Sequence, residues 1–215
     1  MTTTDKIKKE AIILLILLAP IIAMLMMLDK LPAQLPMHWN IDNQVDRMGS
    51  RWELPLFNAG LYALLLILPW IDPRRRNYSA FSGPYYNIRL ILTLFFSTLS
   101  GAIIAYAAGV EMNIGKVVQV GVILLITVLS NYFINLKPNW FVGIRTPWTM
   151  ESEKVWRKTH RLASKLGFWG GILSLALSFL LSGKWQVGLL IAYAIFFSIV
   201  PAVYSYVIFR RESGN

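Results

Sequence analysis

The feature that most constrains this chain is a series of long apolar runs. A helix needs roughly 17–25 mostly apolar residues to cross the hydrocarbon of a bilayer. Six segments reach that length: residues 11–28, 54–71, 89–110, 117–136, 166–183 and 186–209. They are longer than the roughly ten-residue alternating strands of a membrane barrel. The sequence therefore predicts an all-α polytopic membrane protein with six transmembrane helices, the last two forming an antiparallel hairpin.

Composition supports this class. Hydrophobic residues make up 56% of the chain and charged residues only 15%, whereas a soluble domain has about 25% charged residues. Cysteine is absent, which excludes disulfide frameworks and thiolate-metal sites. The net charge of +10 lies in short patches between the apolar runs. We interpret these patches as signals of membrane topology and expect no direct binding of nucleic acid.

The cationic residues also predict the orientation, because cytoplasmic segments of membrane proteins carry the excess of Lys and Arg. With the N-terminus inside, 16 of the 21 Lys and Arg residues are cytoplasmic. The five on the outer side are Lys30, Arg47, Arg51, Lys116 and Lys184. Both termini are therefore predicted to be cytoplasmic, in the cell membrane, and the polar segment between the first two runs to be extracellular.

That outer segment, residues 30–53, is too short for a domain but carries turn chemistry. Pro32 and Pro36 favour extended backbone, and residues 40–43 are typical of a turn. We predict a small folded cap whose exposed face binds an extracellular ligand through His38, Trp39, Asn40, Asp42, Asp46 and Arg47. A metal held by His38 with Asp42 or Asp46 is the weaker alternative, because a second strong nitrogen ligand is missing.

The largest predicted cytoplasmic loop follows the fourth run. Pro138-Asn139 ends that run, and a new helix is predicted to begin at Pro147 or Thr149, with Glu151 and Glu153 in its first turn. Its cations surround an apolar side, which indicates an interfacial amphipathic helix on anionic phospholipid. These cations are Lys154, Arg157, Lys158, Arg161 and Lys165.

Two residues of this loop have several possible partners. Arg145, in a constrained turn, could bind a backbone carbonyl, a phospholipid phosphate or Glu151. His160 is expected to pack or hydrogen-bond inside the loop, with titration near neutral pH as the alternative.

Small residues predict close helix packing at two places. Ser97, Gly101, Ala105 and Gly109 recur every four residues on the third run, and Gly167 and Gly171 lie on the fifth. We expect them to pack within the bundle; a homodimer face is the alternative.

Two ordered sets of residues resemble the SdpI family of bacterial membrane proteins. The outer segment has Leu35-Pro36-Met37-His38-Trp39-Asn40 followed by Val45-Asp46-Arg47, with Asn43 where the family usually has glycine. The cytoplasmic loop has Lys137-Pro138-Asn139, then Gly143-Ile144-Arg145-Thr146, then Val155-Trp156-Arg157-Lys158-Thr159-His160. Asparagine tolerates positive φ, so the same outer turn is expected.

The resemblance implies an immunity protein that protects the cell against a secreted peptide toxin, and it leaves open a second role in signalling to a cytoplasmic partner such as a transcriptional regulator. It implies an N-terminal two-span module at residues 1–87 and an SdpI-like four-span module at 88–215. It also implies partner or lipid contacts in the cytoplasmic loop by Asn139, Gly143, Arg145, Thr146, Trp156 and His160.

Two rival functions remain open at this stage, a small transporter or flippase and a sensor that sequesters a regulator. No G-x-S-x-G, P-loop or H-E-x-x-H pattern is present, so we expect neither catalysis nor a cofactor.

Overall fold

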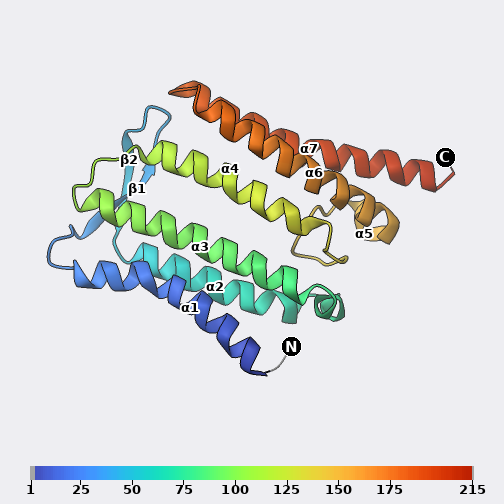
Figure 1. Ribbon diagram of the computed structural model, residues 1–215, viewed down its shortest axis with the longest axis horizontal. Coiled ribbons are helices and arrows are strands. Elements are labelled where there is room, and N and C mark those ends of the chain that lie inside the picture. Colours follow the sequence, from blue (N-terminus) through green and yellow to red (C-terminus); the bar gives the residue numbers. More distant parts are fainter. Residues whose placement is uncertain (1–2, 215) are drawn as a thin grey trace. The chain divides into compact units, whose positions relative to one another are not determined.

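The computed structural model describes residues 3–214 and is mostly helical (Figure 1). The elements in chain order are α1 (Thr3–Met26), β1 (Gln34–Trp39), β2 (Val45–Ser50), α2 (Glu53–Ile71), η1 (Arg75–Ser79), α3 (Ser82–Ala107), α4 (Ile114–Phe133), α5 (Pro147–Glu151), α6 (Glu153–Ser178) and α7 (Lys184–Glu212). The predicted helical membrane class is confirmed. The strands β1 and β2 form a short hairpin that adds to the expected all-α architecture.

Five helices in this part of the chain are long and apolar enough to cross a membrane, namely α1, α2, α3, α4 and α7. The predicted fifth span, residues 166–183, is not among them. Its helix α6 ends at Ser178, so the helical part of the apolar run is shorter than the roughly 17 residues that a span needs. Six spans, and cytoplasmic termini, therefore remain predictions.

The chain forms two compact units, whose boundaries fall inside α2, α3 and α4. The first unit comprises residues up to Leu65 together with Arg89–Gly121, and the second comprises Leu66–Ile88 together with Val122–Asn215. The modules predicted at residues 1–87 and 88–215 are continuous segments of the sequence, and this division remains a prediction.

In the first unit, α1, α2 and α3 are joined by apolar and polar contacts. Met24, Leu31 and Ile104 form a buried cluster. Asn58 Nδ2 donates a hydrogen bond of 2.8 Å to Ser100 Oγ. This bond gives a buried amide donor an acceptor, and without one the donor would be costly in hydrocarbon.

A buried ion pair also joins α1 to α3. Arg89 is 7% exposed and donates to both carboxylate oxygens of Glu10, at 2.8 and 2.7 Å. The Tyr62 hydroxyl donates to Glu10 at 3.1 Å. The bidentate pairing of Arg89 shows how a helix can keep a guanidinium largely out of water.

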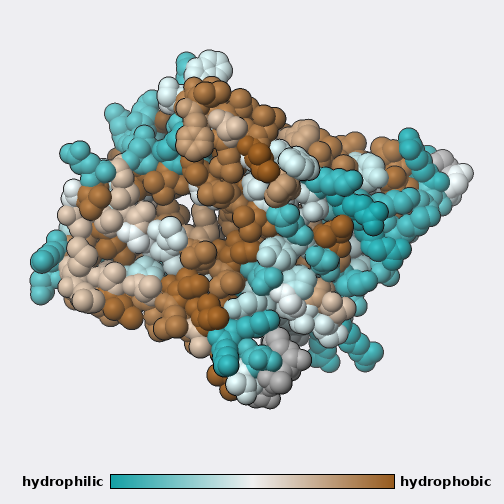
Figure 2. All heavy atoms as spheres, viewed as in Figure 1, coloured by the Kyte–Doolittle hydropathy of each residue, from teal (hydrophilic) through white to brown (hydrophobic). Residues whose placement is uncertain are grey.

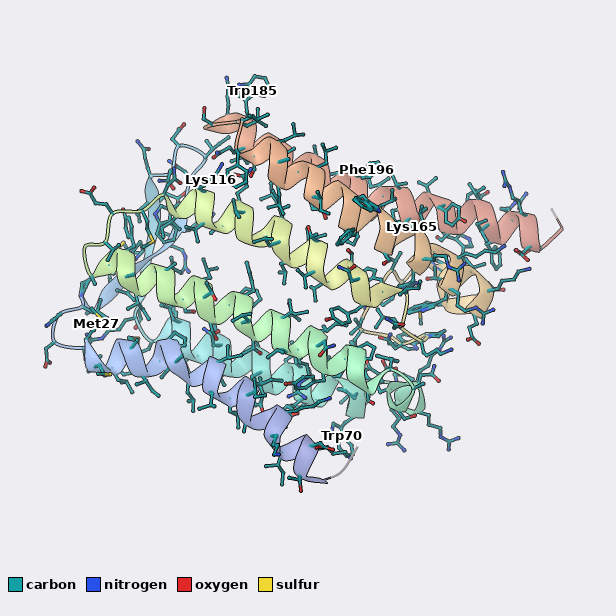
Figure 3. The ribbon with its side chains drawn as sticks, viewed as in Figure 1. Met27, Trp70, Lys116, Lys165, Trp185 and Phe196 are labelled. Carbon is teal, nitrogen blue, oxygen red and sulfur yellow. The ribbon has the colours of Figure 1, made fainter. Side chains whose placement is uncertain are left out.

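In the second unit, α6 and α7 lie side by side as the expected antiparallel hairpin (Figure 1). Figure 2 shows hydrophilic residues over the N-terminal part of α6 and the C-terminal end of α7, and hydrophobic residues over the opposite end of the hairpin. Figure 3 labels Trp185 at the start of α7 and Lys165 on α6. A Trp at a helix end suits a membrane–water boundary.

The prediction from small residues is confirmed on α6, whereas on α3 it is supported only at Ser97, which is 6% exposed. A Cβ atom at Gly167 would overlap Ser130 and Phe197, and one at Gly171 would overlap Thr127. Both glycines therefore let α6 approach α4 and α7 closely. A Cβ at Gly101 of α3, or at Gly109 just after α3, would meet no atom within 4 Å, so no described neighbour requires a glycine at either position.

Candidate functional site

The first candidate site is the hairpin of β1 and β2, which forms the predicted cap. Leu35 pairs with Gly49 and His38 with Arg47, and the register shifts on both sides of His38. Pro36 lies within β1, as proline can in an exposed two-stranded ribbon. The expected extended backbone is therefore confirmed.

Asn40 closes the turn between the strands. Its Oδ1 accepts hydrogen bonds from the backbone N–H groups of Asp42 and Gln44, at 3.0 and 2.9 Å. Asn43 has a φ of 60°, which confirms the expected left-handed residue at this turn. Its Oδ1 accepts from the Gly115 N–H at 2.8 Å, so the turn is anchored to the start of α4.

Two polar pairs lie on the outer surface of the hairpin. His38 Nδ1 lies 2.5 Å from Asp46 Oδ1, with side chains that are 65% and 43% exposed. Both terminal nitrogens of Arg47 donate to Glu53 Oε2 at 3.1 Å. Since all four side chains are exposed, each pair contributes little stability and is accessible to a ligand.

Trp39 and Asp42 differ in how accessible they are. Trp39 packs edge-on against Tyr106, with ring centroids 5.8 Å apart, and its buried Nε1 has no acceptor among the residues described. Asp42 is exposed at the turn. Within residues 3–214, no three His, Asp or Glu side chains gather as metal ligands.

The second candidate site is the loop between α4 and α6, which is closed by Asn139. This residue is 0% exposed. Its Oδ1 accepts from the N–H groups of Phe141 and Val142 at 3.0 and 2.7 Å. Its Nδ2 donates to the carbonyls of Lys137 and Val142, both at 2.9 Å. Asn139 thus holds a backbone that has no regular partner.

Asp72, a residue that our sequence analysis missed, ties this loop to the end of α2. It is 2% exposed and accepts from the Trp140 N–H at 2.9 Å and from the Arg74 N–H at 2.7 Å. The Tyr78 hydroxyl donates to it at 3.0 Å. Burial, followed by the charge of Asp72, raises the pKa of Tyr78 far above its usual range. Tyr78 therefore stays protonated and donates its hydroxyl proton to Asp72.

His160 bridges the loop and α6. Its Nε2 accepts from the Ile144 N–H at 3.0 Å, and its Nδ1 lies 2.9 Å from the Trp156 carbonyl, to which it donates. The ring stacks on Trp156, with centroids 4.0 Å apart. Burial lowers the pKa of His160 to about 4, although the Trp156 carbonyl opposes the shift. The expected packing role is confirmed, and the ring is neutral at physiological pH.

Gly143 has the backbone that this arrangement requires. Its φ is 108°, a value that side chains rarely tolerate. A Cβ at this position would overlap His160 Nε2. The glycine therefore serves both the turn and the close approach of the imidazole.

Arg145 and Thr146 complete the turn before α5. Arg145 is exposed and donates to the Trp140 carbonyl at 2.5 Å, so the backbone alternative for its guanidinium is confirmed. Thr146 caps α5 with Thr149 and lies 2.9 Å from Ser205 Oγ on α7. These contacts fasten the turn to α7.

The helix predicted to begin at Pro147 or Thr149 is two helices, α5 and α6. The break falls at Ser152, whose φ and ψ of −122° and 119° are extended and whose side chain accepts from the Val155 N–H. A serine in this conformation ends one helix and caps the next. Glu153 therefore lies in the first turn of α6, and Glu151 ends α5.

The N-terminal part of α6 is amphipathic, but the chain itself covers its buried side. Val155, Thr159 and Ala163 are buried. Lys154 and Lys158 form ion pairs with Glu212 of α7. The remaining exposed cations are Arg157, Arg161 and Lys165. Contact of this helix with a membrane surface stays a prediction.

The comparisons with known proteins match the two candidate sites to two family segments. Residues 135–205 match the SdpI/YfhL protein family, and residues 15–61 match a domain of unknown function, DUF1648. Residues 135–205 are therefore similar to the SdpI/YfhL family. The resemblance given by the Lys137–His160 residues is thus confirmed, together with the N-terminal module that accompanies it.

One curated relative spans almost the whole SdpI-like chain. Immunity protein SdpI of Bacillus subtilis (strain 168) is 23% identical over 211 residues, which are 97% of this chain and 99% of that protein. No solved structure matches. With five candidate spans, the chain is a multi-pass protein of the cell membrane.

Within the segment that matches the SdpI/YfhL family, burial separates residues that shape the loop from those that face outward. Asn139 and Trp156 are 0% exposed and His160 is 1% exposed. Arg145 is exposed, and Gly143 and Thr146 are partly exposed. Of the six predicted contact residues, Arg145 is thus the one most available to a partner, and its contact remains a prediction.

Two further residues were missed because their partners are distant in sequence. Arg51 Nη1 donates to the Leu28 carbonyl at 2.9 Å and to the Leu31 carbonyl at 3.2 Å. It thereby satisfies carbonyls just after α1, a known role of cations at helix C-termini. Asn77 Nδ2 donates to the Pro138 carbonyl at 2.6 Å. From the sequence, Arg51 contributes only to the count of outer cations, and no local pattern points to Asn77.

We predict that Gly143→Ala destabilises the protein more than Gly183→Ala does. Both glycines have positive φ, so both variants carry backbone strain. Only at Gly143 would a Cβ meet the His160 ring, since nothing lies within 4 Å at Gly183. Overpacking adds about 1–3 kcal/mol to the loss in free energy of unfolding. Denaturant unfolding in detergent measures it, and equal losses would contradict the described packing.

A second prediction concerns pH. His160 has a pKa of about 4 in the folded protein, against about 6.5 in the unfolded chain. As pH falls below 6.5, the unfolded chain binds the proton first. The free energy of unfolding should therefore fall by roughly 3 kcal/mol between pH 6.5 and 4, and the contribution should be complete above pH 6.5.

His160→Gln should flatten this part of the curve, because glutamine keeps an acceptor and a donor but does not titrate. The free energy of unfolding of both proteins, measured at several pH values, gives the two slopes. The acidic residues are the same in both proteins, so their contribution cancels in the difference. Parallel curves would show that His160 is accessible to protons in the folded protein.

Proposed function

We propose that this chain is an integral membrane immunity protein that protects its cell against a secreted peptide toxin. The observation that carries the proposal is the end-to-end match to Immunity protein SdpI of Bacillus subtilis (strain 168), which covers nearly all of both chains. The family match at residues 135–205 supports it. We assign no catalytic step to this function.

The orientation belongs to this proposal. The hairpin of β1 and β2 lies outside the cell and the loop between α4 and α6 lies inside, with both termini cytoplasmic and six spans between them. The distribution of Lys and Arg supports this arrangement.

The toxin is captured on the outer surface of the hairpin. His38 and Asp46 form an exposed pair there, and Arg47 lies opposite His38 in the register. The turn at Asn40 is held by its own amide bonds, so a bound peptide meets a preorganised surface and loses less affinity to ordering. Asp42 adds a carboxylate at the tip.

The cavity in the first unit supports the transporter alternative less than the hairpin supports toxin capture. The cavity beside Asn58 and Ser100 is lined mainly by apolar side chains and has no room for a water molecule. A conduction path for a peptide needs a hydrated polar lining, which this cavity does not supply.

The proposed orientation predicts which introduced cysteines can be labelled from outside the cell. The chain has no cysteine, and Ile41 and Arg76 are both exposed, so single cysteines can be introduced at these positions. In intact cells, a membrane-impermeant maleimide should label the Ile41→Cys variant only. The Arg76→Cys variant should react after permeabilisation. Labelling of both variants in intact cells would place the two residues on the same face of the membrane. It would contradict the proposal that the toxin is recognised outside the cell and sensed inside.

The immunity proposal is tested in a Bacillus subtilis strain that lacks its own Immunity protein SdpI and is exposed to toxin from wild-type cells. The parent chain should restore growth. Asp46→Ala removes a hairpin carboxylate and should raise toxin sensitivity about tenfold at equal expression, the effect of one lost polar anchor. Arg145→Ala tests the contact predicted inside.

Glu111→Ala is the matched control for Asp46→Ala, because Glu111 is an exposed acid outside the hairpin. It should protect like the parent. Failure of the parent chain to protect would refute immunity against this toxin. Full protection by both Asp46→Ala and Arg145→Ala would remove these residues from the mechanism.

A further inference from the structure

A polar pocket lies in the second unit, at the junction of three segments. It has a volume of about 390 Å³ and is lined by Arg74, Asn77, Ala80, Lys137, Pro138, Met150, Glu151 and Glu153. These residues come from the η1 region, the segment after α4, and the junction of α5 and α6. The volume is within the range of small-molecule sites, about 300–1,000 Å³.

Contacts between the segments hold the pocket in shape. Arg74 Nη2 donates to the Met150 carbonyl at 2.7 Å, which joins the η1 region to α5. Asn77 Nδ2 donates to the Pro138 carbonyl, which joins it to the segment after α4. The buried carboxylate of Asp72 supports both contacts, because it binds the N–H groups of Arg74 and Trp140.

The charges that line the pocket are balanced, with two cations and two carboxylates. Glu153 Oε1 lies 3.7 Å from Lys137 Nζ and accepts from Arg157 at 3.3 Å, but all three side chains are about half exposed, so both pairings are loose. Arg74 and Glu151 form no ion pair among residues 3–214. A guanidinium has five N–H donors, and Arg74 uses one for Met150. The pocket therefore offers donors for an anion and a carboxylate for a cation.

The pocket adjoins the ends of two apolar helices. Asp72 directly follows α2, and Lys137 follows α4 by four residues. Trp70, at the end of α2 (Figure 3), is 77% exposed, and Trp140 is 52% exposed. Exposed tryptophans at helix ends mark the headgroup level of a membrane. A ligand of this pocket thus lies where phospholipid headgroups lie.

We propose that this pocket binds a phosphoethanolamine group. Arg74 and Lys137 receive the phosphate, and Glu151 and Glu153 receive the primary ammonium. A phosphoglycerol group would bring the same phosphate to Arg74 and Lys137 but no ammonium to Glu151 and Glu153. A phosphocholine group carries a quaternary ammonium that cannot donate hydrogen bonds to carboxylates. The balanced lining therefore selects a zwitterion with N–H donors.

The same chemistry has two sources, the headgroup of phosphatidylethanolamine and a free phosphoethanolamine ester. Purified full-length protein in nanodiscs with equal amounts of phosphatidylethanolamine, phosphatidylglycerol and phosphatidylcholine tests the first by native mass spectrometry of retained lipid. Calorimetric titration of the detergent-solubilised protein with glycerophosphoethanolamine, glycerophosphoglycerol and glycerophosphocholine tests the second.

We expect about a tenfold preference for the ethanolamine compound, the factor that one charge-assisted hydrogen bond provides. Preference among lipids alone identifies the membrane lipid as the ligand. Preference among the soluble esters identifies the free compound. No preference in either arm, or a preference for the glycerol or choline compound, would overturn the proposal.

Glu151→Gln is the diagnostic variant, because it removes an exposed charge and keeps the size of the side chain. It should lose the tenfold preference while its thermal unfolding stays that of the parent. Glu111→Gln, an exposed acid that does not line the pocket, should keep the preference. If Glu151→Gln keeps it too, the carboxylate has no role in recognition. These readouts are independent of toxin immunity, so either proposal can fail alone.

Discussion

The structure depends on one constraint: a backbone group that water does not reach, in hydrocarbon or inside the protein, must find a partner in the chain itself. Regular helix satisfies this requirement in α1, α2, α3, α4 and α7. The irregular backbone is concentrated in two places, the hairpin region after α1 and the loop after α4. In both, side-chain amides take over the bonds that helical neighbours would make.

The two irregular regions use the same device. Asn40 accepts two backbone N–H groups at the tip of the hairpin, and Asn139 accepts two at the start of the loop. The short Asn side chain reaches the N–H groups two to four residues ahead, where a longer amide would be looser. The regions differ in burial: Asn139 is fully buried, whereas Asn40 is partly exposed. The loop is therefore a small core, and the hairpin is a surface.

This difference changes how the family signature is interpreted. The ordered residues Asn139, Trp156 and His160 carry the resemblance to the SdpI family, and in this structure they are buried and shape the loop. His160 binds the Ile144 N–H and leaves room only for a glycine at position 143. Recognition is more naturally assigned to exposed neighbours, which are Arg145 in the loop and the pair of His38 and Asp46 in the hairpin.

By itself, the sequence determined the class of protein, five of the expected spans, the extended cap and the positive φ of Asn43. Each follows from a local cause: apolar length, proline geometry and the tolerance of asparagine for left-handed backbone. Only the tertiary structure decided the partners of charged residues. Asp72 meets Trp140 across 68 residues and Glu10 meets Arg89 across 79. No local pattern encodes such a pairing, because it depends on which helix ends the packing brings together.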